Sequence, residues 1–280
     1  MKSINTLIED IYAIWEAPDT VVTPEITKGL ADALATIISD RMSEDRSGKR
    51  GLRLSGLGTP DRKLWYQLNE DDKGTEIDGR LRLQFLIGDI MEEVLFWSAK
   101  LAGHTVEDEQ KEVEIDGVKG HIDARIDGKL VDAKTASPFG FRKFREAKLT
   151  EDDAFGYIPQ ISAYAEAEGD KEAYFLAFQK VNAEMALLPI HEMEMINAKT
   201  KVEHQKMVQD LTSTPPRCYD DVPDGASGNR TLAVGCVYCS FNLHCWSDSN
   251  NGGGLRTFQY AKGPRHFTQV MKEPKVEEIL

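Results

Sequence analysis

Residues 112–134 alternate between apolar and polar side chains and are interrupted by Asp-Gly pairs at 116–117 and 127–128. Alternation with a period of two is typical of β-strands, and Asp-Gly favours the tight turn of a hairpin. The pattern therefore predicts three consecutive antiparallel strands, at 112–115, 118–126 and 129–134. Such a ribbon cannot bury its apolar face alone, so other parts of the chain must cover it.

Helical periodicity surrounds these strands, because apolar residues elsewhere recur every three or four positions. Thr23-Pro24 also has the form of a helix start, with a capping residue followed by proline. The order of helix, three strands, helix and strand predicts an α/β fold with a mixed central sheet flanked by helices. Expected helices are 4–15, 24–37, 80–101, 157–168 and 194–211, and further strands are expected at 173–178 and 185–190.

The charge of the chain is negative overall but uneven. The 280 residues include 47 acidic and 34 basic side chains, a net charge of −13, which excludes a basic coat protein. Three segments, 41–53, 139–148 and 249–268, are nonetheless basic; charged segments are most often solvated loops, but these could also bind phosphate. Without a membrane-length apolar run or a signal-peptide pattern, we expect an intracellular, cytoplasmic protein that does not bind membranes.

All four cysteines lie near the end of the sequence, at Cys218, Cys236, Cys239 and Cys245. Disulfides are rare inside cells, whereas four thiolates at this spacing can bind one metal ion or cluster. Zinc and a 4Fe-4S cluster both accept four cysteines, and four reduced, buried cysteines are the alternative without metal. The spacing predicts a metal module that holds the C-terminal segment in place.

The third predicted strand contains Asp132 and Lys134, and Asp123 lies on the strand before it. Residues two apart on a strand face the same side, so Asp132 and Lys134 face one way and Asp123 can meet them across the hairpin. Two carboxylates with a backbone carbonyl suit Mg2+ or Mn2+, and a lysine could stabilise charge on a phosphate. The alternative is a surface ion pair, but Leu130 and Val131 indicate a partly buried strand.

These residues resemble the PD-(D/E)XK nuclease superfamily and, within it, the RecB-like exonucleases. Asp123 matches the aspartate of motif II, and Asp132-Ala133-Lys134 matches the D/E-x-K of motif III. Gln160 and Tyr164 resemble the helical Q-x3-Y motif that lines the active site. The resemblance implies a restriction-endonuclease-like core with catalytic roles for these five residues.

An upstream helical segment resembles the family's G-x3-H, whose histidine is a metal ligand. Here the segment begins at Gly88, and Glu92 stands where the histidine would be. A glutamate can also ligate Mg2+, so Glu92, Asp123 and Asp132 are the implied ligands of Mg2+ or Mn2+. Glu93 is the second choice.

The cysteines resemble the C-terminal C-x2-C-x5-C of the family's iron-sulfur branch, which includes CRISPR-associated adaptation nucleases and helicase-nuclease subunits. In that branch a fourth cysteine lies far upstream, where this chain has Pro60 in a similar Pro60–Tyr66 segment. Cys218 is the natural substitute, which gives a 4Fe-4S cluster on Cys218, Cys236, Cys239 and Cys245, with Zn2+ as the alternative. His244 is a further conceivable ligand, although a surface or supporting role fits it better.

Basic and aromatic residues that follow the D-x-K strand suit single-stranded DNA, because cations bind phosphates and rings stack on bases. Phe139, Phe141 and Phe144 are the rings; a helix that buries its Phe face is the alternative. Arg53 and Ser55 lie in a stretch that resembles the family's R-x-S. The expected DNA-binding residues are Arg53, Ser55, Arg62, Arg142, Lys143, Arg145 and Lys148.

We therefore expect a metal-dependent deoxyribonuclease that degrades DNA from its ends, in recombination, repair or phage DNA processing. A structure-specific endonuclease and a non-catalytic DNA-binding protein are the alternatives. The substrate would be single-stranded DNA or DNA with a free end, and a helicase or recombination protein is a possible partner, because the chain has no ATP-binding G-x4-G-K-S/T motif. The expected parts are 1–79 (helical region and DNA-facing loop), 80–212 (nuclease core) and 213–280 (cysteine segment and tail).

Overall fold

The computed structural model describes residues 2–17, 19–43, 51–76, 78–261 and 263–279. The chain divides into two units. The first comprises residues 1–48, 52–58 and 78–203, and the second comprises 49–51, 59–77 and 204–280. The predicted helical region is thus divided between them, because its first two helices belong to the first unit and residues 59–77 belong to the second.

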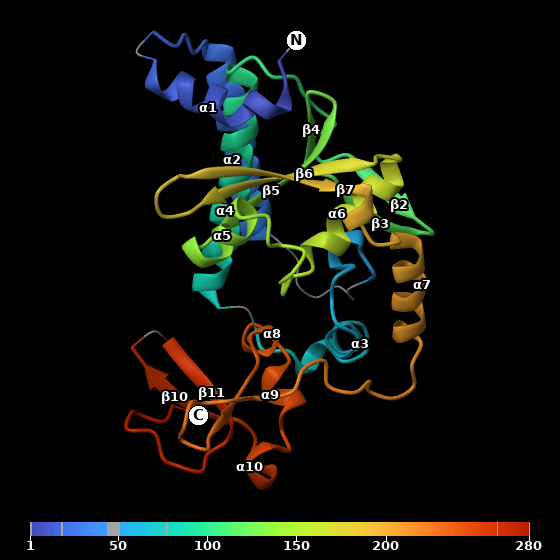
Figure 1. Cartoon of the computed structure of the whole chain (residues 1–280), viewed down its shortest axis with the longest axis vertical. Coiled ribbons are helices and arrows are strands. Elements are labelled where there is room, and N and C mark those ends of the chain that lie inside the picture. Colours follow the sequence, from blue (N-terminus) through green and yellow to red (C-terminus); the bar gives the residue numbers. More distant parts are fainter. Residues whose placement is uncertain (1, 18, 44–50, 77, 262, 280) are drawn as a thin grey trace. The chain divides into compact units, whose positions relative to one another are not determined.

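The first unit is built on a five-stranded sheet in the order β1-β4-β5-β6-β7 (Figure 1). β5 and β6 are parallel, and the other neighbouring pairs are antiparallel. The prediction of an α/β fold with a mixed central sheet and flanking helices is therefore confirmed. The strands are β1 (Val106–Glu107), β4 (Ala124–Ile126), β5 (Lys129–Ala136), β6 (Glu172–Gln179) and β7 (Met185–His191).

Helices cover both faces of this sheet. Apolar residues of β5 alternate between two cores: Leu130 and Ala136 face one, and Val131 and Ala133 face the other. The core of Leu130 includes side chains of α5, α6 and α7, whereas that of Val131 includes side chains of α1 and α4. The helices of the first unit, with α7 ending in the second, are α1 (Leu7–Glu16), α2 (Pro24–Ser43), α4 (Gly79–Leu101), α5 (Pro138–Arg145), α6 (Tyr157–Glu168) and α7 (Ala198–Gln209).

Local capping explains where these helices begin. The Asp78 side chain accepts a hydrogen bond from the Leu81 N–H at 2.7 Å, which caps α4. Ser137 caps α5 in the same way, and Pro138 follows it at the first helical position. α6 is bounded by Gly156 and Gly169, both in the left-handed conformation that glycine adopts at little cost.

The prediction of one strand over 118–126 is wrong. Residues 118–121 form β3 (Val118–His121), which pairs with β2 (Glu112–Ile115) in a separate two-stranded sheet, whereas β4 joins the central sheet. Between β3 and β4, the Ile122 N–H donates to the Lys111 carbonyl and the Asp123 carbonyl accepts from the Gln110 N–H. These bonds to the preceding loop break the strand at Asp123, although the apolar alternation continues through it.

The second unit contains helix α3 and a four-stranded sheet in the order β10-β11-β9-β8. Figure 1 labels α3, β10 and β11. Leu232, Trp246 and Leu255 form a small core in it. No described helix in either unit is long and apolar enough to cross a membrane. The helices and strands of the second unit are α3 (Asp61–Asn69), β8 (Val222–Pro223), β9 (Arg230–Thr231), α8 (Val234–Val237), α9 (Asn242–Cys245), α10 (Ser249–Gly252), β10 (Arg256–Tyr260) and β11 (Gly263–Gln269).

Two glycines allow two loops of the first unit to touch where α6 begins. A Cβ built on Gly58 would lie 2.3 Å from the Gly156 Cα, which is far inside van der Waals contact. Gly156 also has a positive φ of 75°. The position of α6, which carries Gln160 and Tyr164, therefore depends on a backbone contact that only glycine permits.

We predict that Gly58→Ala lowers the free energy of unfolding by about 2 kcal/mol, because one of the two backbones must move. The matched control is Gly29→Ala in α2, where a Cβ would meet nothing within 4 Å. That variant should gain up to about 1 kcal/mol from helix propensity. Urea unfolding followed by circular dichroism measures both, and equal stability of the two variants would refute the close contact.

Candidate active site

Asp132 and Lys134 form an ion pair on the central strand β5. Asp132 is 1% exposed, and the side chain of Lys134 is 16% exposed. The ammonium of Lys134 touches the carboxylate, yet neither Asp132 oxygen receives a well-directed hydrogen bond from the described residues. A buried carboxylate usually has several donors, so this one is under-satisfied.

Asp123 reaches the same place from the break between β3 and β4. Its Oδ2 accepts a hydrogen bond from the Ala133 N–H at 2.8 Å, and Ala133 lies between Asp132 and Lys134. The strand break that the sequence analysis missed thus lets Asp123 turn towards β5. The structure brings Asp123, Asp132 and Lys134 together, as the hairpin argument predicted, although by a different backbone path.

Glu92 approaches from α4. A Cβ on Gly88, one turn earlier in this helix, would lie 3.6 Å from the Thr135 Oγ1, so α4 passes close to β5. Glu92 accepts a hydrogen bond from the Gln110 Nε2 at 2.8 Å. Its neighbour Glu93 has a different environment, in which the nearby charges are Glu109 and Lys100.

Electrostatic interactions connect the three carboxyl groups. Burial, and then the charges of Asp123 and Asp132, raise the pKa of Glu92 to about 9. Burial and the charge of Asp132 raise the pKa of Asp123 to about 7. Burial also raises the pKa of Asp132, against the opposing effect of Lys134. One lysine does not balance three carboxylates, so the cluster has excess negative charge when ionised.

Lys134 carries the positive charge of the cluster. Burial by itself lowers its pKa, but Asp132 and Asp123 outweigh that effect, and the net pKa is raised. Its Nζ also lies 5.4 Å from the centre of the Tyr157 ring, within range of a cation–π interaction. Lys134 is therefore a cation at neutral pH and is held between a carboxylate and an aromatic face.

Gln160 and Tyr164 lie one turn apart on α6, where the Gln160 Nε2 donates to the Tyr164 hydroxyl at 3.3 Å. Tyr164 is buried, which raises its pKa, and the charges of Asp132 and Asp123 also act on it. A Cβ on Gly120 would lie 3.0 Å from the Tyr164 ring and 2.8 Å from Leu54 Cβ. Gln160 and Tyr164 therefore belong to the surroundings of the cluster.

The donor set fits a hard divalent cation in its chemistry. The carboxyl groups of Glu92, Asp123 and Asp132 interact electrostatically, and that of Asp132 is buried without hydrogen-bond donors of good geometry. Among the described residues, however, no three such side chains are close enough to hold an ion. Lys134 and Gln110 instead contact oxygens of Asp132 and Glu92.

The proposed stacking of bases on Phe141 and Phe144 is wrong, because both rings are buried in the core. Of the three rings, Phe139 is exposed (66%), with the Arg142 guanidinium 5.6 Å and the Lys143 ammonium 5.8 Å from its centre. Helix α5 is strongly amphipathic, so its second and third phenylalanines face the sheet.

Three of the six predicted DNA-binding cations are paired with acidic side chains. Lys143 pairs with Asp152, Arg145 with Glu184, and Lys148 with Glu146. Arg53 and Ser55 are exposed on either side of the buried Leu54. The basic segment 41–53 lies partly outside the described residues, which resume at residue 51.

Arg62, in the second unit, is engaged within the fold. Its guanidinium donates to the Tyr66 hydroxyl at 3.0 Å and to the Pro215 carbonyl at 3.0 Å. These bonds give Arg62 a structural role in holding α3 to the segment before Cys218.

All four cysteines line one pocket of about 30 Å³ in the second unit. Burial and then the neighbouring thiols raise the pKa of Cys236 to about 11, although the nearby Trp246 side chain acts in the opposite direction. The Trp246 Nε1 is buried and makes no hydrogen bond within the described part of the chain. Four sulfurs around one pocket fit a thiolate-bound metal, but no ligating group of three or more side chains is formed within the described part of the chain.

Pro60, which stands where the resemblance implies a cysteine, lines the same pocket as the four cysteines. Cys218, the expected substitute, also lines it and is exposed. His244 contacts Glu70 through Nε2 at 3.2 Å and is not among the lining residues.

Two residues beside the carboxylate cluster were not predicted from the sequence. Tyr157 could have been found, because it precedes Gln160 by three positions and Tyr164 by seven and therefore shares their face of α6. No sequence pattern indicated Gln110, because it lies in an irregular segment before β2. Only the folded chain brings it to Glu92.

No family model matches this chain, and no curated protein matches it. Its resemblance to solved structures is remote, as two of them illustrate. The crystal structure of SSO0001 has a TM-score of 0.42 and 18% identity, over 79% of this chain and 96% of that chain. The crystal structure of LHK-Exo in complex with dAMP has a TM-score of 0.32 and 14% identity, over 64% of this chain and 91% of that chain.

We predict that Glu92→Gln stabilises the metal-free protein at alkaline pH. A carboxyl group whose pKa is raised on folding stabilises the fold below its unfolded pKa and loses that contribution as the pH rises through the folded value. For Glu92 the folded value is about 9, so wild-type stability in EDTA should fall from pH 5 to pH 9. Glu92→Gln should flatten this fall and gain about 1 kcal/mol or more at pH 8.

Urea unfolding between pH 5 and 9 in EDTA measures this effect. Glu112→Gln is the control, because Glu112 is exposed and pairs with Lys119 at 2.7 Å; it should give no gain. A Glu92→Gln profile parallel to that of the wild type would contradict the clustering of charge at Glu92.

Proposed function

We propose that this chain is a metal-dependent DNA exonuclease that hydrolyses phosphodiester bonds from DNA ends. The observation that carries the proposal is the buried, under-satisfied carboxylate of Asp132, which lies among Asp123, Glu92 and Lys134. Buried excess negative charge destabilises a fold and persists where a cation or a reaction uses it. The PD-(D/E)XK resemblance of the same residues supports the proposal.

In this proposal Glu92, Asp123 and Asp132 hold Mg2+ or Mn2+. The bound ion would supply positive charge to the scissile phosphate and acidify a water molecule. Ala133, through its N–H bond to Asp123 Oδ2, fixes the orientation of one ligand. Lys134 is already a buried cation beside Asp132, so it can stabilise negative charge that develops on the phosphate and orient the attacking water.

Gln160 and Tyr164 form one wall of the proposed site. Tyr164 is buried and its hydroxyl accepts from Gln160, so the amide of Gln160 is held in one orientation. An amide in this position can bind a phosphate or sugar oxygen of the substrate. The proposed DNA path follows Arg53, Ser55, Phe139 and Arg142, whereas Lys143, Arg145 and Lys148 would first have to leave their acidic partners.

A structure-specific endonuclease uses the same core, and a non-catalytic DNA-binding protein could retain it. The complete set of Glu92, Asp123, Asp132 and Lys134 favours catalysis over the second alternative. Exonuclease and endonuclease differ in whether DNA without ends is a substrate. Recombination, repair or phage DNA processing, with a helicase or recombination protein as partner, is the proposed context.

We further propose that Cys218, Cys236, Cys239 and Cys245 hold a 4Fe-4S cluster, with Zn2+ as the alternative. The pocket that all four cysteines line supports this. The metal would be structural, because it would join Cys218 to the segment around α8 and α9 and so close a loop of the second unit.

The nuclease prediction is tested on end-labelled linear and circular DNA, single- and double-stranded, with Mg2+, Mn2+ or EDTA. We expect degradation of linear DNA alone, dependent on metal. Asp132→Ala and Lys134→Ala should each reduce the rate by at least about 100-fold, because each removes a group that contacts the reacting phosphate or its metal.

Lys129→Ala is the matched control. Lys129 lies on the same strand but pairs with Glu172 at 2.8 Å, so its removal should leave the rate unchanged. Cleavage of circular DNA would establish the endonuclease alternative. DNA binding without cleavage in any metal would contradict the proposal and support the non-catalytic alternative.

The cysteine prediction is tested on protein purified without oxygen. A brown protein with broad absorbance near about 400 nm indicates a 4Fe-4S cluster, whereas a colourless protein with about one zinc per chain indicates the alternative. Cys239→Ser should lower metal content and the thermal unfolding midpoint of the second unit. Unchanged stability, with neither iron nor zinc in the wild type, would exclude a metal module.

A further inference from the structure

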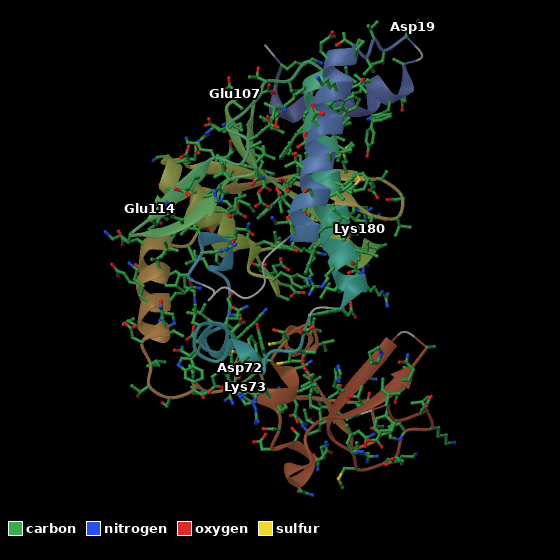
Figure 2. All side chains as sticks on the ribbon, turned by 180° about the vertical axis from the view of Figure 1, so that it is seen from behind. Asp19, Asp72, Lys73, Glu107, Glu114 and Lys180 are labelled. Carbon is green, nitrogen blue, oxygen red and sulfur yellow. The ribbon has the colours of Figure 1, made fainter. Side chains whose placement is uncertain are left out.

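Gln110 connects two of the proposed metal ligands. It lies in the connection between β1 and β2, whose strands are marked in Figure 2 by the labelled Glu107 and Glu114. Its side-chain Nε2 donates to Glu92 Oε1 at 2.8 Å, and its backbone N–H donates to the Asp123 carbonyl at 3.1 Å. Gln110 thus contacts the carboxylate of Glu92 on α4 and the backbone of Asp123 at the break between β3 and β4.

The backbone of Gln110 is in an unfavourable conformation. Its φ is 54°, in the left-handed region that residues with a Cβ seldom adopt, and Asp108 in the same connection has a φ of 53°. Such conformations cost about 1 kcal/mol or more each and persist where surrounding contacts impose them. The conformation directs the Gln110 N–H at Asp123 while its amide reaches Glu92.

We infer that Gln110 is a positioning residue that fixes Glu92 and Asp123 relative to each other for cation binding. The inference rests on the proposed function, because it assigns these two carboxylates to one metal site. Gln110 itself would not touch the metal or the DNA.

The chemistry of the contact suits this role. Glu92 has three side-chain torsions, is half-buried and has one oxygen bonded to Gln110, so that bond restricts its rotamers and leaves the other oxygen for a cation. The Nε2 is a donor, as a carboxylate requires, and carries no charge that would compete with the cation. Partners of this kind orient ligands, and their loss typically weakens metal affinity by about 10-fold or more.

The test is calorimetric titration of Mn2+ into the full chain without DNA, on wild type, Gln110→Met and Gln110→Gly. Met keeps the length of the side chain and the strained backbone but removes the donor. Gly removes the donor and relieves the backbone. We expect both to bind Mn2+ roughly 10-fold more weakly than wild type, although Gly should unfold at a higher temperature than Met in EDTA. Gln259→Met, on β10 in the second unit, is the control and should bind like wild type.

The outcomes separate a failure of the proposed function from a failure of the role assigned to Gln110. If wild type binds no Mn2+, both the proposed function and this inference fail. If wild type binds Mn2+ and both Gln110 variants bind it equally well, the inference alone fails, and a change confined to thermal stability gives Gln110 a merely structural role. In the DNA assay, if Gln110 is a positioning residue, both Gln110 variants should need a higher Mn2+ concentration than wild type to reach half of their maximal rate. Their kcat at saturating Mn2+ should be close to that of wild type.

Discussion

The buried contact of Asp132 with Lys134 is the constraint around which the first unit is arranged. β5 is an interior strand with cores on both faces, and at its centre stands a carboxylate that is 1% exposed. Burying a charge is costly unless it is paired and hydrogen bonded, and here the pairing is to one lysine. The apolar residues of β5, β6 and β7 supply the stability that tolerates it.

The surrounding elements place further charge beside this pair instead of neutralising it. Asp123 arrives through a broken strand, Glu92 through a long helix, and their pKa values are raised because burial and mutual repulsion disfavour three negative charges. The close glycine contact that sets the start of α6 adds Gln160 and Tyr164 to the same region. Such a local loss of folding stability is typical of functional sites.

Strong apolar periodicity in the sequence predicted several helices and strands. It did not predict features that depend on the course of the backbone between these elements. The observed bounds of α4, α6, β6 and β7 follow the predicted ones closely. The last three bury apolar side chains along their length, whereas the buried residues of α4 lie in its last two turns. The alternation through 118–126 did not reveal the break at Asp123, since Ile122 stays buried while the backbone changes sheet.

The candidate site was predictable in its residues and not in its supporting contacts. Asp123, Asp132 and Lys134 follow from strand geometry, and Glu92 follows from the resemblance of its segment to the family's G-x3-H. Gln110 and the Ala133 N–H act through contacts that local sequence does not encode. The burial of Phe141 and Phe144 was also not predictable from local sequence. A basic, aromatic helix has the same sequence pattern whether its rings face the core or the solvent.

The most direct test of the central claim is a crystal structure of the protein soaked in Mn2+, with anomalous diffraction to locate the metal. We expect an anomalous peak within coordination distance of carboxylate oxygens of Asp123 and Asp132, with Glu92 turned towards it. A map with no peak at this cluster at millimolar Mn2+, or with Lys134 still in place against Asp132 and the metal elsewhere, would contradict it.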